Sequence, residues 1–111
     1  MNICLGTDSL ASVHKPRRQS VELNLFEEMR ALAKNEPSLS ARKIVRMATL
    51  NGARALGLAG QAGEISRHAL ADLITIPYAG KPAGVPEAIL AHTGSVSASL
   101  IDGRWAIPPQ S

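Results

Sequence analysis

The sequence predicts an α/β fold, and three patterns in its 111 residues indicate this. A short apolar run over residues 3–5 stops at Gly-Thr-Asp-Ser, which is typical of a strand covered on both faces. Between residues 25 and 56, apolar residues recur at helical spacing. Beyond residue 60 the pattern becomes extended, and it includes an Asp-Gly hairpin signal at Asp102.

The strand predicted over residues 3–5 leads to Asp8. In α/β folds the chemistry lies at the carboxyl ends of strands, so Asp8 is the first candidate for a functional residue. Asp8 and Ser9 are also residue types that cap helices or close Asx-turns after strands. Both interpretations stay open from the local pattern.

The first helical pattern covers residues 25–33 and follows a loop expected over residues 13–23. Asn24 precedes the helix and Glu27 follows three residues later, a combination that caps a helix N-terminus. We expect this helix to end near residues 35–37 because a proline stands there.

A second helix is expected to start at Ser38 or Ser40, with an apolar stripe that includes Ile44. The helical pattern breaks at residues 51–52, where Asn is followed by Gly. Residues 53–56 then predict a short third helix that the following glycines end.

The last part of the chain predicts a small antiparallel sheet. Pro86 is expected to start one more helix, which runs to His92. Asp102-Gly103 is a strong signal for a type I′ hairpin turn. The strands are predicted over residues 63–65, 71–77, 95–101 and 104–107.

Composition excludes several classes of protein. Hydrophobic residues make up 45% and charged residues 19%, which predicts a globular chain and excludes wholesale disorder. A single cysteine, Cys4, cannot form an internal disulfide, so we expect a cytoplasmic protein. No apolar run has the length of a membrane span, and we expect no membrane partner.

The net charge of +3 raises the alternative of nucleic-acid binding. A basic patch covers residues 14–18, and Arg42, Arg46 and Arg54 lie on what could be a helix-turn-helix. The patch has no interleaved aromatic residue, and nothing in the helix pair supplies base-reading side chains. Solvated surfaces are therefore the preferred interpretation of these charges.

Four motifs follow one another in a recognisable order: Leu-Gly-Thr-Asp-Ser at residues 5–9, Met-Ala-Thr-x-Asn-Gly-Ala-x-Ala-Leu-Gly-Leu at 47–58, Ala-Asp-Leu at 71–73 and Asp-Gly-Arg at 102–104. Each motif alone is common. The ordered set resembles the C-terminal portion of a metal-dependent amidohydrolase of the cytosine-deaminase-like, chlorohydrolase-type branch.

This resemblance implies a fragment of a (β/α)8 barrel over residues 1–60, with its last strand and the following helices, and part of a small β-sandwich over residues 61–111. It implies hydrolytic deamination of an amino-substituted heterocycle or nucleoside with a divalent metal, zinc or iron, that activates water. Asp8 matches the aspartate that contacts this metal and takes a proton from the water. Thr7 and Ser9 would at most orient Asp8.

The chain is expected to be inactive alone, because a complete barrel has about 250 residues. The His-x-His pair of the family is absent from the sequence. His14, His68 and His92 all follow Asp8, and we expect none of them to bind metal. A zinc site takes three or four ligands, so one aspartate cannot hold the metal.

Two further expectations follow from the resemblance. The sheet would lack its N-terminal strands, so we expect either self-association or association with a missing N-terminal portion. A non-catalytic interaction or assembly module is the alternative function. Where relatives have Pro-Gly-Lys, this chain has Arg-His-Ala at residues 67–69, which removes a glycine suited to positive φ.

Overall fold

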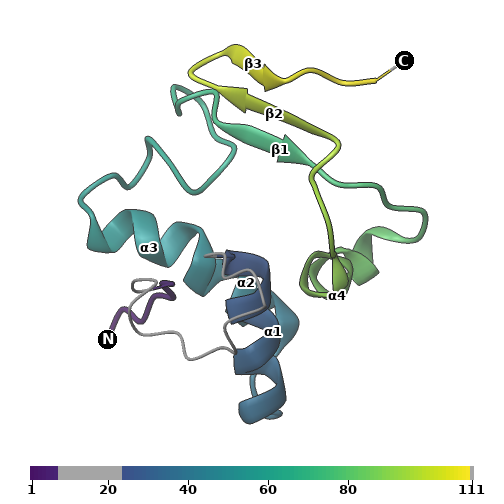
Figure 1. Ribbon diagram of the computed structural model, residues 1–111. Helices are drawn as coiled ribbons and strands as arrows, with labels where there is room; N and C mark the ends of the chain where they lie inside the picture. The colour runs from purple at the N-terminus through teal and green to yellow at the C-terminus, as the bar shows by residue number, and fades with distance from the viewer. Residues whose placement is uncertain (8–23, 111) are drawn as a thin grey trace, which may run out of the picture.

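The computed structural model describes residues 1–7 and 24–110, and it combines helices with a small antiparallel sheet. The sheet lies above the helices in Figure 1, and the chain crosses between them more than once. The helices are α1 (Leu25–Asn35), α2 (Ala41–Ala48), α3 (Leu50–Ala55) and α4 (Val85–Ala91), and a 3-10 turn at Pro82–Gly84 precedes α4. The strands are β1 (Leu73–Thr75), β2 (Ala98–Ile101) and β3 (Arg104–Ile107).

The starts of α1 and α2 follow the sequence pattern. The Asn24 side chain accepts a hydrogen bond from the backbone N–H of Phe26, and the Ser40 side chain accepts one from Lys43. Each bond satisfies an N–H that the first turn of a helix leaves without a partner. Ser40, and not Ser38, is therefore the cap of α2.

The break between α2 and α3 lies earlier than the sequence predicts. Thr49 alone separates the two helices, with φ of −123° and ψ of −87°, and α3 runs through Asn51 and Gly52. The Thr49 hydroxyl donates to the carbonyl of Val45 one turn back, at 2.8 Å. A hydroxyl that bonds to the preceding turn can end a helix without a glycine, which explains the displaced break.

The hairpin at the end of the chain is confirmed. Asp102 and Gly103 have φ of 51° and 75°, and positive φ at both central residues defines a type I′ turn. The strand order is β1-β2-β3, with both pairs antiparallel. Leu73 lies opposite Leu100, which in turn lies opposite Trp105, so these side chains share one face.

Two predicted strands do not form. Residues 3–5 have no strand partner, and the side chains of Ile3 and Cys4 are exposed. A buried parallel strand needs neighbours on both sides, and none of the described strands runs beside residues 3–5. Residues 63–65 do not form a strand, and Gly63 and Glu64 are bends, because Gly63 has a φ of 79° that interrupts extended backbone.

The turn before β1 keeps a positive φ although it lacks a glycine. The N–H of Ala69 donates to the carbonyl of Ser66 at 3.1 Å, and His68, the third residue of this turn, has a φ of 69°. Positive φ at that position is the geometry of a type II turn, where glycine is preferred. The loss of a glycine put the positive φ of this turn in doubt, but His68 adopts a positive φ there.

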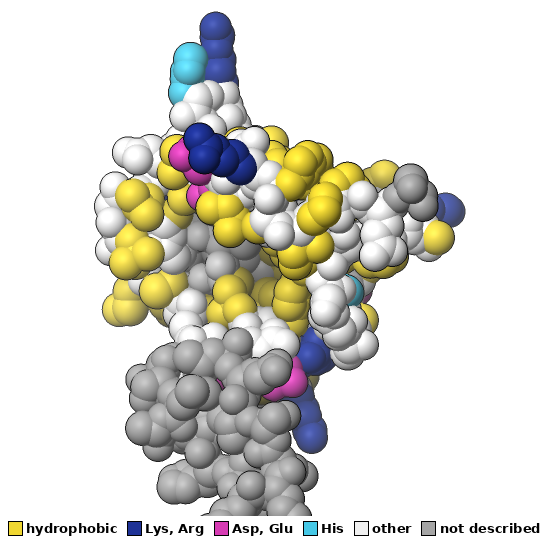
Figure 2. Space-filling view, turned by 45° about the horizontal axis from the view of Figure 1, so that its top comes forward, with side chains coloured by type: hydrophobic (Ala, Val, Ile, Leu, Met, Phe, Trp, Pro, Cys, Tyr) yellow, Lys and Arg dark blue, Asp and Glu magenta, His cyan; other side chains and the backbone are white. Residues whose placement is uncertain are grey.

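The buried part of the described chain is small. Met29, Ile44, Ala53 and Ala98 are buried, and Ile44 of α2 is fully enclosed where α1 and α4 pack against that helix. Large hydrophobic side chains of the sheet remain exposed, among them Ile74, Ile101 and Trp105. Figure 2 shows hydrophobic side chains around a hollow on one face of the molecule. None of the described helices is both long and apolar enough to cross a membrane.

Candidate functional site

The candidate catalytic and metal-binding residue, Asp8, lies outside the described residues, as do Ser9, His14 and the basic patch at residues 14–18. Thr7 is described and is half-buried. The structure therefore describes the backbone as far as Thr7, the residue before Asp8.

Residues 2–5 are held on the junction of α2 and α3 by hydrogen bonds. The N–H of Leu5 donates to the carbonyl of Met47 at 3.0 Å. The side-chain amide of Asn51 donates to the carbonyl of Ile3 at 2.8 Å, and the side-chain amide of Asn2 donates to the carbonyl of Asn51 at 2.9 Å. Leu5, the first residue of the Leu-Gly-Thr-Asp-Ser motif, is thus a neighbour in space of Met47, the first residue of the next motif.

The two described histidines, His68 and His92, have different surroundings. His68 is exposed in its turn, whereas the His92 ring packs against Phe26 with 5.0 Å between ring centroids. Arg30 donates to the carbonyl oxygens of Leu90 and His92, which satisfies backbone acceptors at the end of α4. Among residues 1–7 and 24–110, no three His, Cys, Asp or Glu side chains are grouped as metal ligands.

The Ala-Asp-Leu motif supports the hairpin. The Asp72 carboxylate accepts a hydrogen bond of 2.7 Å from the backbone N–H of Asp102, and the carbonyl of Ala71 accepts one of 3.0 Å from Gly103. A charged acceptor forms a stronger bond than a neutral one. This carboxylate therefore holds a turn and is no candidate for catalysis.

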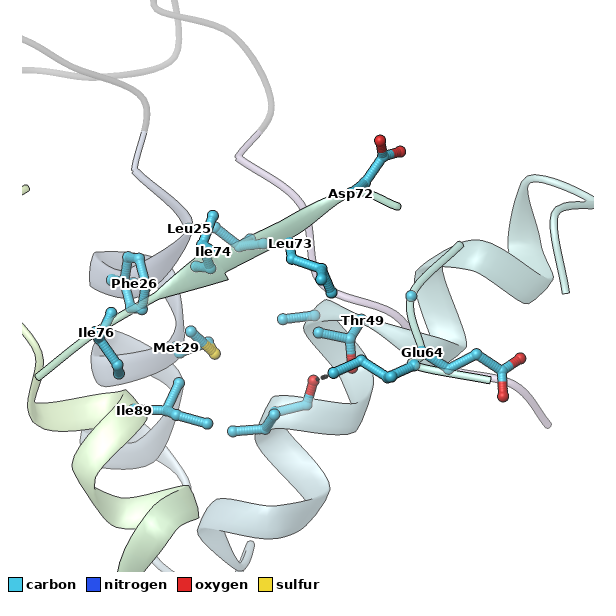
Figure 3. A pocket seen from close by; sticks show the side chains of 14 residues that line it. Leu25, Phe26, Met29, Thr49, Glu64, Asp72, Leu73, Ile74, Ile76 and Ile89 are labelled. Atoms are coloured by element: carbon cyan, nitrogen blue, oxygen red, sulfur yellow. Dashed lines mark hydrogen bonds between the residues drawn. The ribbon is translucent and has the colours of Figure 1, made fainter. Parts of the chain in front are cut away.

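An open apolar cavity of about 550 Å³ lies between β1 and the helices. In Figure 3, Leu73, Ile89 and Met29 surround the cavity, whereas the carboxylates of Glu64 and Asp72 point away from it. The walls can accept apolar side chains but offer no described group for acid–base chemistry. Sequence reasoning did not identify this cavity, although the apolar stripes of α1 and α4 are the signal that could have indicated it. The other lining residues are Leu25, Phe26, Val45, Ala48, Thr49, Gly63, Ile65, Ile74 and Ile76.

The helix pair does not have the geometry of a DNA-binding motif. A helix-turn-helix joins its helices by a turn of three or four residues, but Thr49 alone separates α2 from α3. Arg42, Arg46 and Arg54 are exposed, as expected of solvated side chains. The helix-turn-helix suggested by the sequence is thus replaced by a sharp bend.

Comparison with known proteins identifies the family. The model of the amidohydrolase family matches residues 1–106. The chain is 41% identical over 93 residues to a 5-methylthioadenosine/S-adenosylhomocysteine deaminase of Syntrophobacter fumaroxidans, and 43% identical over 83 residues to a protein of the same name from Acetivibrio thermocellus. It is 32% identical over 117 aligned positions to a 5'-deoxyadenosine deaminase of Methanosarcina mazei.

These alignments cover most of this chain and a small part of each relative. They include 78%, 68% and 94% of the chain, but only 19%, 18% and 25% of the three relatives. The chain thus spans about a quarter or less of the length of these relatives. The ordered motifs and the family match over residues 1–106 together show that the chain belongs to the amidohydrolase family.

Proposed function

We propose that this chain is the C-terminal part of a metal-dependent deaminase that acts on an adenosine-type nucleoside. The family match over residues 1–106, together with relatives that are named deaminases of adenosine derivatives, carries this proposal. In the reaction, water adds to the ring carbon that bears the amino group, the C–N bond breaks, and ammonia leaves. Residues 1–60 would form the end of a (β/α)8 barrel, and residues 61–111 part of an adjoining β-sandwich.

Asp8 is the residue of this chain that we assign to the chemistry. Its carboxylate would provide one oxygen ligand to the metal, zinc or iron, and would accept a proton from the attacking water. The described residues do not fit a metal, because they bring no three potential ligands together. The remaining ligands would therefore come from a preceding part of a longer protein. When bound, the metal supplies activated water.

The exposed apolar surfaces support the view that another polypeptide segment covers this chain. Ile74, Ile101 and Trp105 of the sheet are 54%, 58% and 58% exposed, and the apolar cavity beneath β1 is open. Within residues 1–7 and 24–110, no further strand pairs with the edge strands β1 and β3, which leaves backbone groups for another strand. A preceding segment of a longer chain would cover these surfaces, and without it a second copy would do so.

Sedimentation of the 111-residue polypeptide tests this covering. We expect the apparent mass to rise above 11.7 kDa as the concentration increases, because a second copy would bury the sheet. Replacing Trp105 with Lys places a charge on the face of the sheet that Trp105 shares with Leu73 and Leu100, and it should lower the apparent mass at each concentration. A monomer at every concentration would contradict the prediction.

The single cysteine supports a reducing compartment. Cys4 is a free, exposed thiol, and such thiols persist where cysteines are kept reduced. We therefore propose that the protein acts in the cytoplasm, which fits a nucleoside substrate.

Substitution of Asp8 tests the catalytic assignment. In the native protein that carries this sequence, Asp8→Asn should lower ammonia release from 5'-deoxyadenosine by about a hundredfold or more, because it removes a metal ligand and proton acceptor. Asp72→Asn is the matched control, since that carboxylate holds the hairpin, and it should leave turnover nearly unchanged. Equal activity of Asp8→Asn and the unmodified protein would overturn the assignment. Absence of any deaminase activity in the unmodified protein would favour the interaction module.

A further inference from the structure

We draw no further inference here: the strongest candidate, the open apolar cavity of about 550 Å³ between β1 and the helices, carries nothing beyond the proposed function, because nothing in the described residues shows what covers it.

Discussion

His68 shows at the scale of one residue how a sequence departure can be absorbed. The position matches a glycine of the family pattern, and the backbone of His68 adopts the left-handed conformation with a φ of 69°. A side chain in this conformation crowds the following carbonyl, at a cost of about 1–2 kcal/mol. The sequence shows that His68 departs from the family pattern. It could not indicate whether the turn would change its conformation or keep a positive φ at a cost in conformational energy.

His68→Gly should raise the free energy of unfolding by about 0.5–1 kcal/mol. The relief of the left-handed strain exceeds the entropy that glycine loses on folding, which is about 0.5–1 kcal/mol. Urea unfolding of the native protein measures the difference. Arg67→Gly, one residue earlier and without a positive φ, should instead lower stability, and the hypothesis fails if both variants shift it in the same direction.

At the scale of elements, residues of the family motifs make contacts between segments that are distant in the sequence. The Asp72 carboxylate holds the turn at Asp102, and Asn51 holds Ile3. A sequence read one segment at a time reveals each motif but not its partner. This is why Ala-Asp-Leu and Asp-Gly-Arg were identified separately and joined only by the structure.

Gly63 lies where the loop after α3 touches the α2–α3 bend. A Cβ there would come within 2.6 Å of the Thr49 carbonyl oxygen, which already accepts a hydrogen bond from Ala53. Because that carbonyl is fixed by the helix, it cannot move aside without breaking the first turn of α3.

Gly63→Ala should therefore lower the free energy of unfolding by about 2–5 kcal/mol, the combined cost of left-handed strain and overpacking. Gly57→Ala is the matched control, since Gly57 has a similar φ of 74° but nothing within 4 Å of its Cβ position. It should cost about 1–2 kcal/mol from strain alone. Equal losses in urea unfolding would show that the Thr49 contact has no effect.

At the scale of the molecule, local patterns predicted the helices and the hairpin well. Asn24 and Ser40 cap helices, and Asp102 turns the hairpin, because these residues act on backbone within a few positions. The predicted strand at residues 3–5 did not form, since a strand depends on neighbours that the described chain does not provide. Pattern alone cannot reveal whether such neighbours exist.

The candidate site was predicted less completely than the fold. The order of motifs led to the family, which comparison confirms over residues 1–106. Asp8 stays a prediction because it lies outside the described residues. The sequence did not indicate the apolar cavity or the hydrogen bond from the Asn51 side chain to the Ile3 carbonyl. Each depends on residues that are distant in sequence and meet only in the folded chain.

Intact mass and metal content of the native protein, measured together, test the central claim most directly. If this sequence is the C-terminal part of a deaminase, the native species should be of roughly barrel size, about 250 residues or more, with about one zinc or iron per chain. A metal-free species of 11.7 kDa would contradict the account.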